Sequence, residues 1–179
     1  MYQGFNLYKT LIIVPIALVS VLVLGGFFYR SVVRVDPRIV KAVQDQDLAL
    51  LKSLSQDAAL NWYQSSMALE HYAGLACDSG DLYLQSILNS SNISLRRAIY
   101  TGCYTRSFKE VAWMIERGLQ DGYSYNRYQS LDYLGRTGEG SSYRKTIEKR
   151  VSDSSSMVRI RATDLLAAIS KDRLSSQGN

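Results

Sequence analysis

Hydrophobic and polar positions follow two patterns in this chain, one near its beginning and one along the rest. Residues 11–28 form an unbroken run of eighteen uncharged, mostly apolar residues. From Ile39 onward, apolar residues recur three and four positions apart, which is the spacing of amphipathic helices. No segment alternates apolar and polar residues at a period of two. The pattern therefore predicts an all-α protein.

The predicted helices come in pairs separated by Ser, Asp, Asn and Gly, which cap helices and form turns. The first helix of each pair is expected over residues 47–54, 81–89, 108–119 and 143–151. The second helix is expected over residues 58–76, 93–104, 125–137 and 156–170. This arrangement predicts about four helical hairpins in succession.

The hairpins repeat at a fixed period along the sequence. An acidic or amide residue recurs every 32 residues, at Asp57, Asn89, Asp121 and Asp153. At the same step, a small residue recurs at Ser66, Ala98, Ser130 and Ala162, and a large one at Leu51, Tyr83, Ile115 and Ile147. A period of this length is typical of solenoids, in which each hairpin buries its apolar face against its neighbours. We therefore predict a short α-solenoid over residues 39–171, whose product is a surface and not a catalytic pocket.

The last copy carries the clearest repeat motif, with Asp153 followed by Val158, Arg159, Ala162 and Leu166. This stretch resembles the HEAT-like repeat family of the PBS-lyase type, in which an Asp precedes Val-Arg-x-x-Ala-x-x-x-Leu. The resemblance covers about residues 43–171. It implies a structural ladder of Asp and Arg side chains, formed here by Asp57, Asn89, Asp121, Asp153, Arg127 and Arg159. The first copy departs from the pattern because Tyr63 replaces the Arg, and in the second copy Arg96 is displaced by one position.

The apolar run has the length of a membrane span. A helix over residues 11–28 would cover roughly 27 Å, close to the ~30 Å hydrocarbon core of a bilayer. Lys9 and Arg30 bound the run, and aromatic residues flank it on both sides, as in an interfacial aromatic belt. A cleaved signal peptide is disfavoured because the run is long and no small-x-small site follows it.

These features predict a domain organisation built around one membrane span. A short tail over residues 1–10 precedes a transmembrane helix over residues 11–29, which contacts the lipid bilayer. A connector over residues 30–38 leads into the solenoid over residues 39–171, and a flexible polar tail covers residues 172–179.

The sequence gives conflicting signals about the side of the membrane on which the solenoid lies. Basic residues after the span (Arg30, Arg34, Arg38 and Lys41) favour the cytoplasm. Long domains, however, are exported largely regardless of charge, and a short N-terminal tail is usual for an uncleaved signal anchor. The sequence narrowly favours a single-pass protein of the bacterial inner membrane with a periplasmic domain.

Two cysteines, Cys77 and Cys103, fall near the ends of second helices in adjacent copies. Neighbouring helices pack about 8–10 Å apart, whereas a disulfide requires Cα atoms within about 7 Å. A disulfide is therefore expected only if the turn at Cys77 leans towards its neighbour. Such a bond implies an oxidising compartment.

The sequence offers little for catalysis. His71 is the single histidine, and the cysteines do not form a C-x-x-C pair. His71 and Cys103 occur in corresponding segments of adjacent copies, which favours a structural role. The sequence contains no glycine-rich phosphate loop and no paired carboxylates. We therefore predict no enzyme activity, no cofactor and no metal site.

Binding is the function that the composition favours. The net charge is +5, and Tyr residues number 13. The candidate partner-binding residues are Tyr123, Tyr125, Tyr128, Arg96, Arg97 and Arg161. Tyr is enriched at protein interfaces, so a scaffold that docks protein subunits of a membrane assembly is the first hypothesis. The alternatives are a receptor for an anionic ligand or acidic protein, and a HEAT-like lyase-type enzyme or enzyme accessory. Nucleic acid is disfavoured because no basic cluster is interleaved with stacking aromatics.

Overall fold

The structure is a stack of α-helices in chain order. The computed structural model describes residues 35–177, with side chains described as far as Lys171. This part of the chain contains no strand, so the all-α prediction is confirmed for it. The elements are α2 (Pro37–Gln44), α3 (Leu48–Ser55), α4 (Trp62–Ala76), α5 (Leu82–Leu88), α6 (Ile93–Cys103), α7 (Phe108–Leu119), α8 (Ser124–Thr137), the 3-10 helix η2 (Glu139–Tyr143), α9 (Arg144–Arg150) and α10 (Ser156–Gln177).

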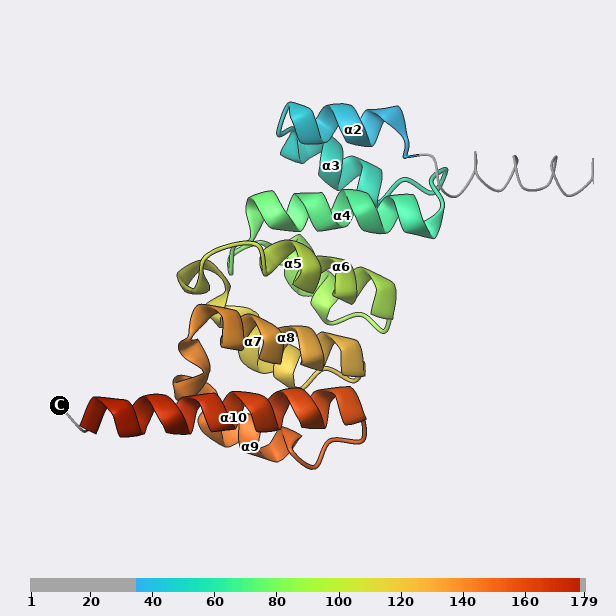
Figure 1. Cartoon of the computed structure of the whole chain (residues 1–179). Helices are drawn as coiled ribbons and strands as arrows, with labels where there is room; N and C mark the ends of the chain where they lie inside the picture. Colours follow the sequence, from blue (N-terminus) through green and yellow to red (C-terminus); the bar gives the residue numbers. More distant parts are fainter. Residues whose placement is uncertain (1–34, 178–179) are drawn as a thin grey trace, which may run out of the picture.

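The helices pair as α3–α4, α5–α6, α7–α8 and α9–α10, with α2 packed on α3 at one end (Figure 1). We call α3, α5, α7 and α9 the first helices and α4, α6, α8 and α10 the second helices. The second helices also contact one another in series, α4 with α6, α6 with α8 and α8 with α10. The apolar stripes of the first and second helices form one continuous core that includes Leu51, Leu69, Ile99, Ile115 and Leu134. The molecule is therefore a helical repeat-like stack in which each hairpin is buried by its neighbours.

Three element boundaries differ from the predictions by more than one residue. α4 begins at Trp62 and not at residue 58, because the Asn61 side chain caps the helix by accepting the backbone N–H of Gln64. α2 begins at Pro37, inside the predicted connector, because the Asp36 carboxylate caps its first turn. The last helix, predicted to end at residue 170, continues as α10 to Gln177, within the segment predicted to be a flexible tail over residues 172–179. No Gly or Pro interrupts that helix before residue 178.

The predicted membrane helix over residues 11–29 lies outside the described residues, as do the tail over residues 1–10 and most of the connector. Within residues 35–177, none of the helices combines the length and the apolar character that crossing a bilayer requires.

Buried ion pairs join consecutive hairpins at the turns that precede the second helices. Arg96 donates from Nε and Nη2 to the two carboxylate oxygens of Asp121, at 2.9 and 3.0 Å. One hairpin later, Arg127 donates in the same way to Asp153, at 2.8 and 2.6 Å. Burial raises the pKa of the Asp153 carboxyl, but the contacts with Arg127, the N–H of Ser155 and Arg150 together outweigh burial and lower that pKa to about 2. We call these two pairs the Asp–Arg ladder.

Each arginine of the ladder also braces the turn of its own hairpin. Nη1 of Arg127 donates to the backbone carbonyls of Asp121 and Gly122, and Nη1 of Arg96 donates to that of Ser90. Each aspartate in turn caps its own turn, Asp121 by accepting the N–H of Tyr123 at 2.8 Å. The bidentate Arg–carboxylate pair therefore links neighbouring hairpins and fixes both turns.

The two earlier acidic or amide positions are partnered differently. Asp57 accepts from Arg38, whose side chain is about half exposed, and the Asn89 amide oxygen accepts from Arg117. Asn89 receives no arginine from the second helix of the preceding hairpin, because Tyr63 occupies the arginine position of that copy.

A close helix approach lies at the other end of the second helices. Cys77, the C-cap of α4, is bonded to Cys103 at the end of α6, with a Cα–Cα distance of 5.4 Å. Gly102 permits this approach, because a Cβ there would overlap the carbonyl oxygen of Glu70 on α4. The extended backbone of Cys77, with ψ at 92°, turns the chain towards α6. The disulfide thus forms where two helices lie closer than the usual packing distance.

Gly102→Ala is expected to lower the free energy of unfolding by roughly 1–3 kcal/mol, since the methyl group must push α4 and α6 apart. Thermal unfolding of the full chain, followed by circular dichroism, would measure the effect. Gly122→Ala is the matched control, because a Cβ at Gly122 meets no atom within 4 Å. Equal effects of the two substitutions would contradict the close-approach explanation.

Candidate functional site

The second helices line one side of the stack, and this second-helix face is hollowed along its length. Its N-terminal hollow lies among α4, α6 and α8 and has a volume of about 470 Å³. Two aromatic residues from the first turn of α4 line it, Trp62 at 69% exposed and Tyr63 at 39% exposed. Such large exposed aromatic surface is costly to leave in water and is characteristic of binding sites.

The opposite wall of the N-terminal hollow combines a cation with an aromatic ring. The guanidinium of Arg97 on α6 lies 4.7 Å from the ring centroid of Tyr125 on α8. Glu70 on α4 lines the same hollow, and burial raises the pKa of its carboxyl, while His71 and Arg97 act in the opposite direction. The hollow therefore offers aromatic surface, one cation and one partly buried carboxyl to a ligand.

Two further hollows continue the face towards the C-terminal end. A central hollow of about 270 Å³ shares Tyr125 and Gln129 with the N-terminal hollow. The C-terminal hollow, about 490 Å³ between α8 and α10, shares Tyr128 and Asp132 with the central one. Adjacent hollows share lining residues, so the three lie in series across the four second helices. We call this series of hollows the groove.

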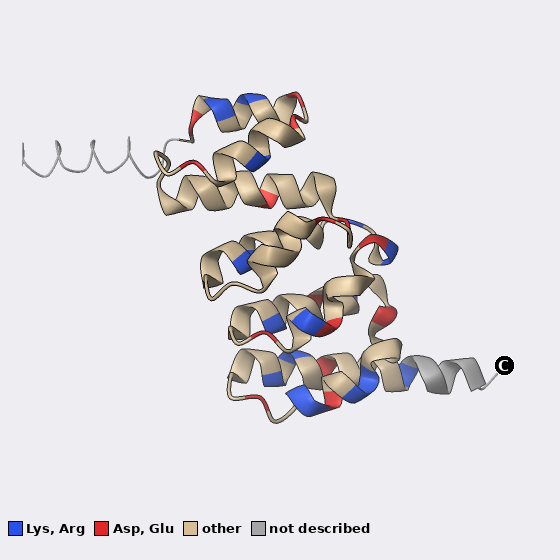
Figure 2. Cartoon of the chain, turned by 180° about the vertical axis from the view of Figure 1, so that it is seen from behind, with Lys and Arg blue, Asp and Glu red and all other residues tan. Residues whose placement is uncertain are grey.

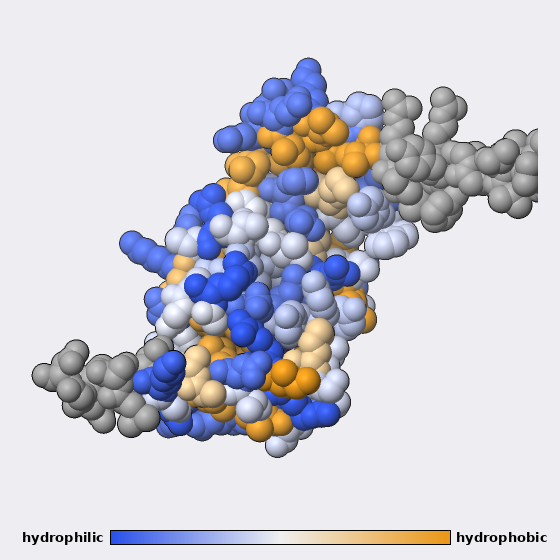
Figure 3. All heavy atoms as spheres, in the orientation of Figure 1, coloured by the Kyte–Doolittle hydropathy of each residue, from blue (hydrophilic) through white to orange (hydrophobic). Residues whose placement is uncertain are grey.

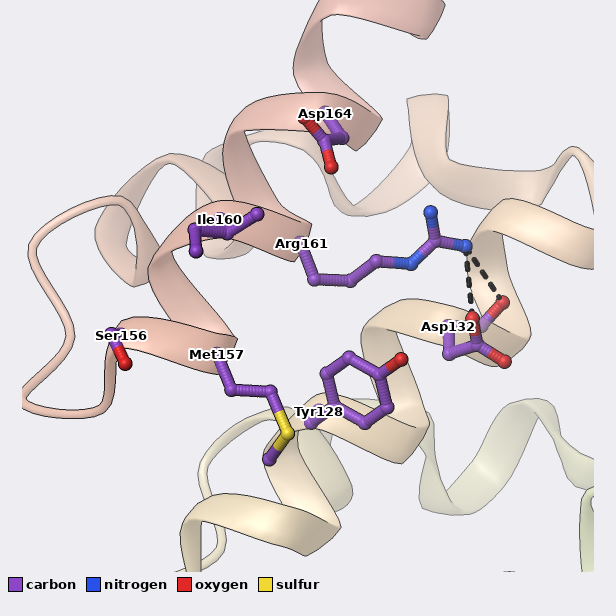
Figure 4. Close-up of a pocket in the computed structure, with 7 residues that line it drawn as sticks. All are labelled: Tyr128, Asp132, Ser156, Met157, Ile160, Arg161 and Asp164. Carbon is purple, nitrogen blue, oxygen red and sulfur yellow. Dashed lines mark hydrogen bonds and ion pairs between the residues drawn. The ribbon is translucent and has the colours of Figure 1, made fainter.

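The C-terminal hollow has an apolar side and a charged side (Figure 4). Met157 projects from α10 beside the ring of Tyr128, and Ile160 lines the same hollow from another turn of α10. On the charged side, Arg161 of α10 reaches across to Asp132 of α8, with 3.1 Å between nitrogen and carboxylate oxygen. This part of the groove presents apolar surface, and its arginine already has a partner.

Five of the six predicted partner-binding residues lie on or beside the groove. Tyr125, Tyr128, Arg97 and Arg161 line it. Tyr123 lies next to it, with its ring centroid 6.4 Å from that of Tyr125. The tyrosines therefore form a short aromatic row on α8, because the Tyr125 and Tyr128 rings are also 6.2 Å apart.

The prediction that Arg96 contacts a partner is wrong. Its side chain is 12% exposed and is engaged by Asp121 in the Asp–Arg ladder, so it is not available to a partner. The neighbouring Arg97 projects into the groove instead. Adjacent residues on a helix point about 100° apart, so only one of the two can face the groove.

Sequence reasoning missed the most exposed aromatic residue of the groove, Trp62, together with Tyr63. Their signal was present, because two aromatics in the first turn after the Asn61 cap occupy positions outside the apolar stripe of α4. Ile160 was also missed, although it stands between two arginines on a face that the helical spacing leaves outside the core.

The groups considered for catalysis are the two cysteines and His71. Cys103 is buried and bonded to Cys77, so it carries no free thiol. His71 is exposed and lines the N-terminal hollow. Among the described side chains, no three His, Cys, Asp or Glu residues are grouped so as to hold a metal ion.

A second exposed apolar area lies at the N-terminal end of the stack. Figure 3 shows hydrophobic residues gathered around α2 and α3, where Val40 and Leu48 are exposed. This end directly follows the connector from the predicted membrane span.

Comparison of the chain with models of protein families, with curated proteins and with solved structures gave no significant match.

Proposed function

We propose that this chain is a non-catalytic, single-pass membrane scaffold that docks a protein partner within a membrane-bound assembly. The observation that carries the proposal is the groove of the second-helix face, with Trp62, Tyr63 and Tyr125 at its N-terminal hollow. Exposed Trp, Tyr and Arg residues beside a concave surface are the residue types that dominate binding energy at protein interfaces.

The proposal includes two finer points about architecture. We propose that residues 11–29 anchor the chain in the bilayer, which the exposed apolar residues of α2 and α3 support, since they lie at the adjacent end of the stack. We also propose that the stack is a HEAT-like solenoid, which the Asp–Arg ladder supports.

The proposed location of the stack is the periplasmic side of a bacterial inner membrane. The bond between Cys77 and Cys103 supports this side, because disulfides persist in oxidising compartments.

A receptor for an anionic ligand is the weaker alternative. Arg96 and Arg161 are each paired with a carboxylate, Asp121 and Asp132. Arg97 is then the one cation of the proposed set that has no ion pair among the described residues. One cation over an aromatic ring suits a protein side chain or backbone carbonyl as well as an anion.

Trp62→Ala is expected to weaken partner binding by at least about tenfold, because truncating a buried interface Trp typically costs about 2 kcal/mol or more. The measurement is quantitative recovery of co-purifying proteins after gentle detergent extraction of the full chain. Tyr63→Ala is expected to act in the same direction. Leu82→Ala is the matched control, because Leu82 is 77% exposed but lies on α5, outside the groove.

Unchanged recovery with Trp62→Ala, or an equal loss with Leu82→Ala, would contradict the groove as the docking site. Binding that is lost in high salt and with Arg97→Glu, but retained with Trp62→Ala, would favour the anionic-ligand alternative.

A further inference from the structure

The Asp–Arg ladder is incomplete at the C-terminal end of the stack. Nη1 of Arg159 donates to the backbone carbonyls of Asp153 and Ser154 at 2.8 and 3.0 Å, as Arg127 does in the preceding hairpin. In this side-chain conformation, Nε and Nη2 of Arg127 donate to the Asp153 carboxylate of the next hairpin. The described residues supply no carboxylate to Nε and Nη2 of Arg159, which is exposed. A bidentate donor is therefore positioned without an acceptor.

A second lateral pairing ends at the same place. Asp132 of α8 pairs with Arg161 of α10, at 3.1 Å. The residue that corresponds to Asp132 one period later is Asp164. Asp164 is exposed, and no cation of the described residues pairs with it. The end hairpin thus presents an unpaired cation and an unpaired carboxylate, each at a position that is paired one hairpin earlier.

Apolar residues at this end are also more exposed than their equivalents one hairpin earlier. Leu119 of α7 is fully buried, whereas Val151, its equivalent one period later, is 38% exposed. Tyr128 of α8 is partly buried, whereas its equivalent Ile160 is 62% exposed. Val151 and Ile160 are hydrophobic like their equivalents, although a terminal capping repeat of a solenoid normally has a polar outer face. Together, Arg159, Asp164, Val151 and Ile160 form what we call the end face.

We propose that the end face docks a helical hairpin of a partner protein, which continues the stack by one repeat. The geometry of Asp153 and Arg161 defines the partner. Its inter-helix turn carries an Asp that accepts from Arg159, and an Arg eight residues later pairs with Asp164, as Arg161 follows Asp153 by eight residues. Ile160 and Asp164 also line the C-terminal hollow, so the end face adjoins the groove. A hairpin stacked on the end of the array is nevertheless a different kind of partner from a ligand of the groove, and the inference does not rest on the proposed function.

Charge and sequence favour a different protein over a second copy. Residues 144–171 contain seven Lys or Arg and three Asp or Glu, so the C-terminal hairpin is basic and suits an acidic turn (Figure 2). Within this chain, Asp153 and Arg161 are already engaged inside the stack. Eight residues after Asp57 stands Ser65, and eight after Asp121 stands Gln129. The described turns therefore leave no second Asp-to-Arg signature for a copy to offer.

The test is site-specific photo-crosslinking of the full chain in its native membrane. A benzophenone amino acid replaces Thr163, an exposed residue between Ile160 and Asp164 on α10. A crosslinked protein is expected at this position and not with the probe at Leu82 on α5. Arg159→Glu should reduce the adduct by at least about tenfold, because it places like charges at a bidentate contact. Arg144→Glu, an exposed charge change on α9, should leave it unchanged.

The adduct alone does not establish the proposal, so the crosslinked segment of the partner must be sequenced. Support requires a helix–turn–helix segment with an Asp and, eight residues on, an Arg. It also requires that Asp→Arg in that turn restores the adduct of the Arg159→Glu chain. An adduct of two copies of this chain, an adduct insensitive to Arg159→Glu, or no adduct above the Leu82 level would overturn the proposal. Circular dichroism of each variant separates loss of binding from loss of folding.

Discussion

Arg127→Ala is expected to lower the free energy of unfolding by about 3 kcal/mol, because it removes the bidentate partner of the buried Asp153 carboxylate. Only the single contact from Arg150, at 3.2 Å, then remains as an ion pair to that carboxylate. The Arg127 and Asp153 side chains are 8% and 2% exposed, so water cannot replace the lost hydrogen bonds. The same change frees the backbone carbonyls of Asp121 and Gly122 that Arg127 braces. Urea unfolding of the full chain in detergent, followed by circular dichroism at the helical band, measures the loss.

The ladder also predicts a dependence of stability on pH. The folded pKa of Asp153 is lowered to about 2 from its ordinary value of 3.8. A depressed pKa contributes stability above the unfolded value and loses it as pH falls through the folded one. The stabilisation is therefore expected to be complete above about pH 4 and to disappear towards about pH 2. In the Arg127→Ala chain this pH-dependent contribution should be much smaller.

Arg144→Ala is the control for the ladder, because Arg144 makes an exposed pair with Glu148 one turn away on the same helix. Exposed pairs of this kind contribute about 0.5 kcal/mol or less. If Arg127→Ala were no more destabilising than Arg144→Ala, the ladder would not be a principal link between hairpins.

Removing the disulfide is expected to cost about 3 kcal/mol of folding stability. Cys77 and Cys103 are 26 residues apart, and cross-linking a loop of that size restricts the unfolded chain by roughly this amount. The Cys77→Ala, Cys103→Ala double variant should unfold at lower urea concentration than the wild type. Reduction of the wild type should reproduce the shift, and reduction of the variant should have no effect.

The side of the membrane needs an exposed reporter thiol, because Cys77 and Cys103 are buried. In intact cells, a membrane-impermeant maleimide should label Leu82→Cys, at an exposed position of α5, if the stack is periplasmic. Labelling of this variant only after the cells are lysed would contradict that location.

The ladder and the disulfide act at opposite ends of the second helices. Arg96 lies in the first turn of α6 and pairs with the following hairpin, whereas Cys103 ends α6 and is bonded to the preceding one. The groove lies between these two fixed ends. Destabilising either end is therefore expected to disturb the groove indirectly, which is why each binding variant needs a folding control.

Most of the helices could be predicted because their signals are local. α7 was predicted at its observed bounds, since Ser107 and Glu110 form a capping box at its start and Leu119 is followed by a polar turn. The predicted start of α4 was wrong because the Asn61 cap was not recognised. The predicted end of α10 was too early because the polar residues after residue 170 were not assigned to the helix. The direction of a side chain was harder to predict, and Arg96 shows why. A displacement of one position in the motif did not turn it outward, because Asp121 lies within its reach.

By itself, the sequence determined an all-α chain of hairpins with a fixed period, an apolar run long enough to span a bilayer, and an acidic or amide position before each second helix. These properties follow from spacing and local chemistry, which can be read along the chain. Only the tertiary structure decided which arginine enters the ladder, that Cys77 reaches Cys103, and that Trp62 and Tyr63 open onto a groove with Tyr125. These depend on distances between side chains that are far apart in the sequence, and those distances are set by how neighbouring hairpins pack.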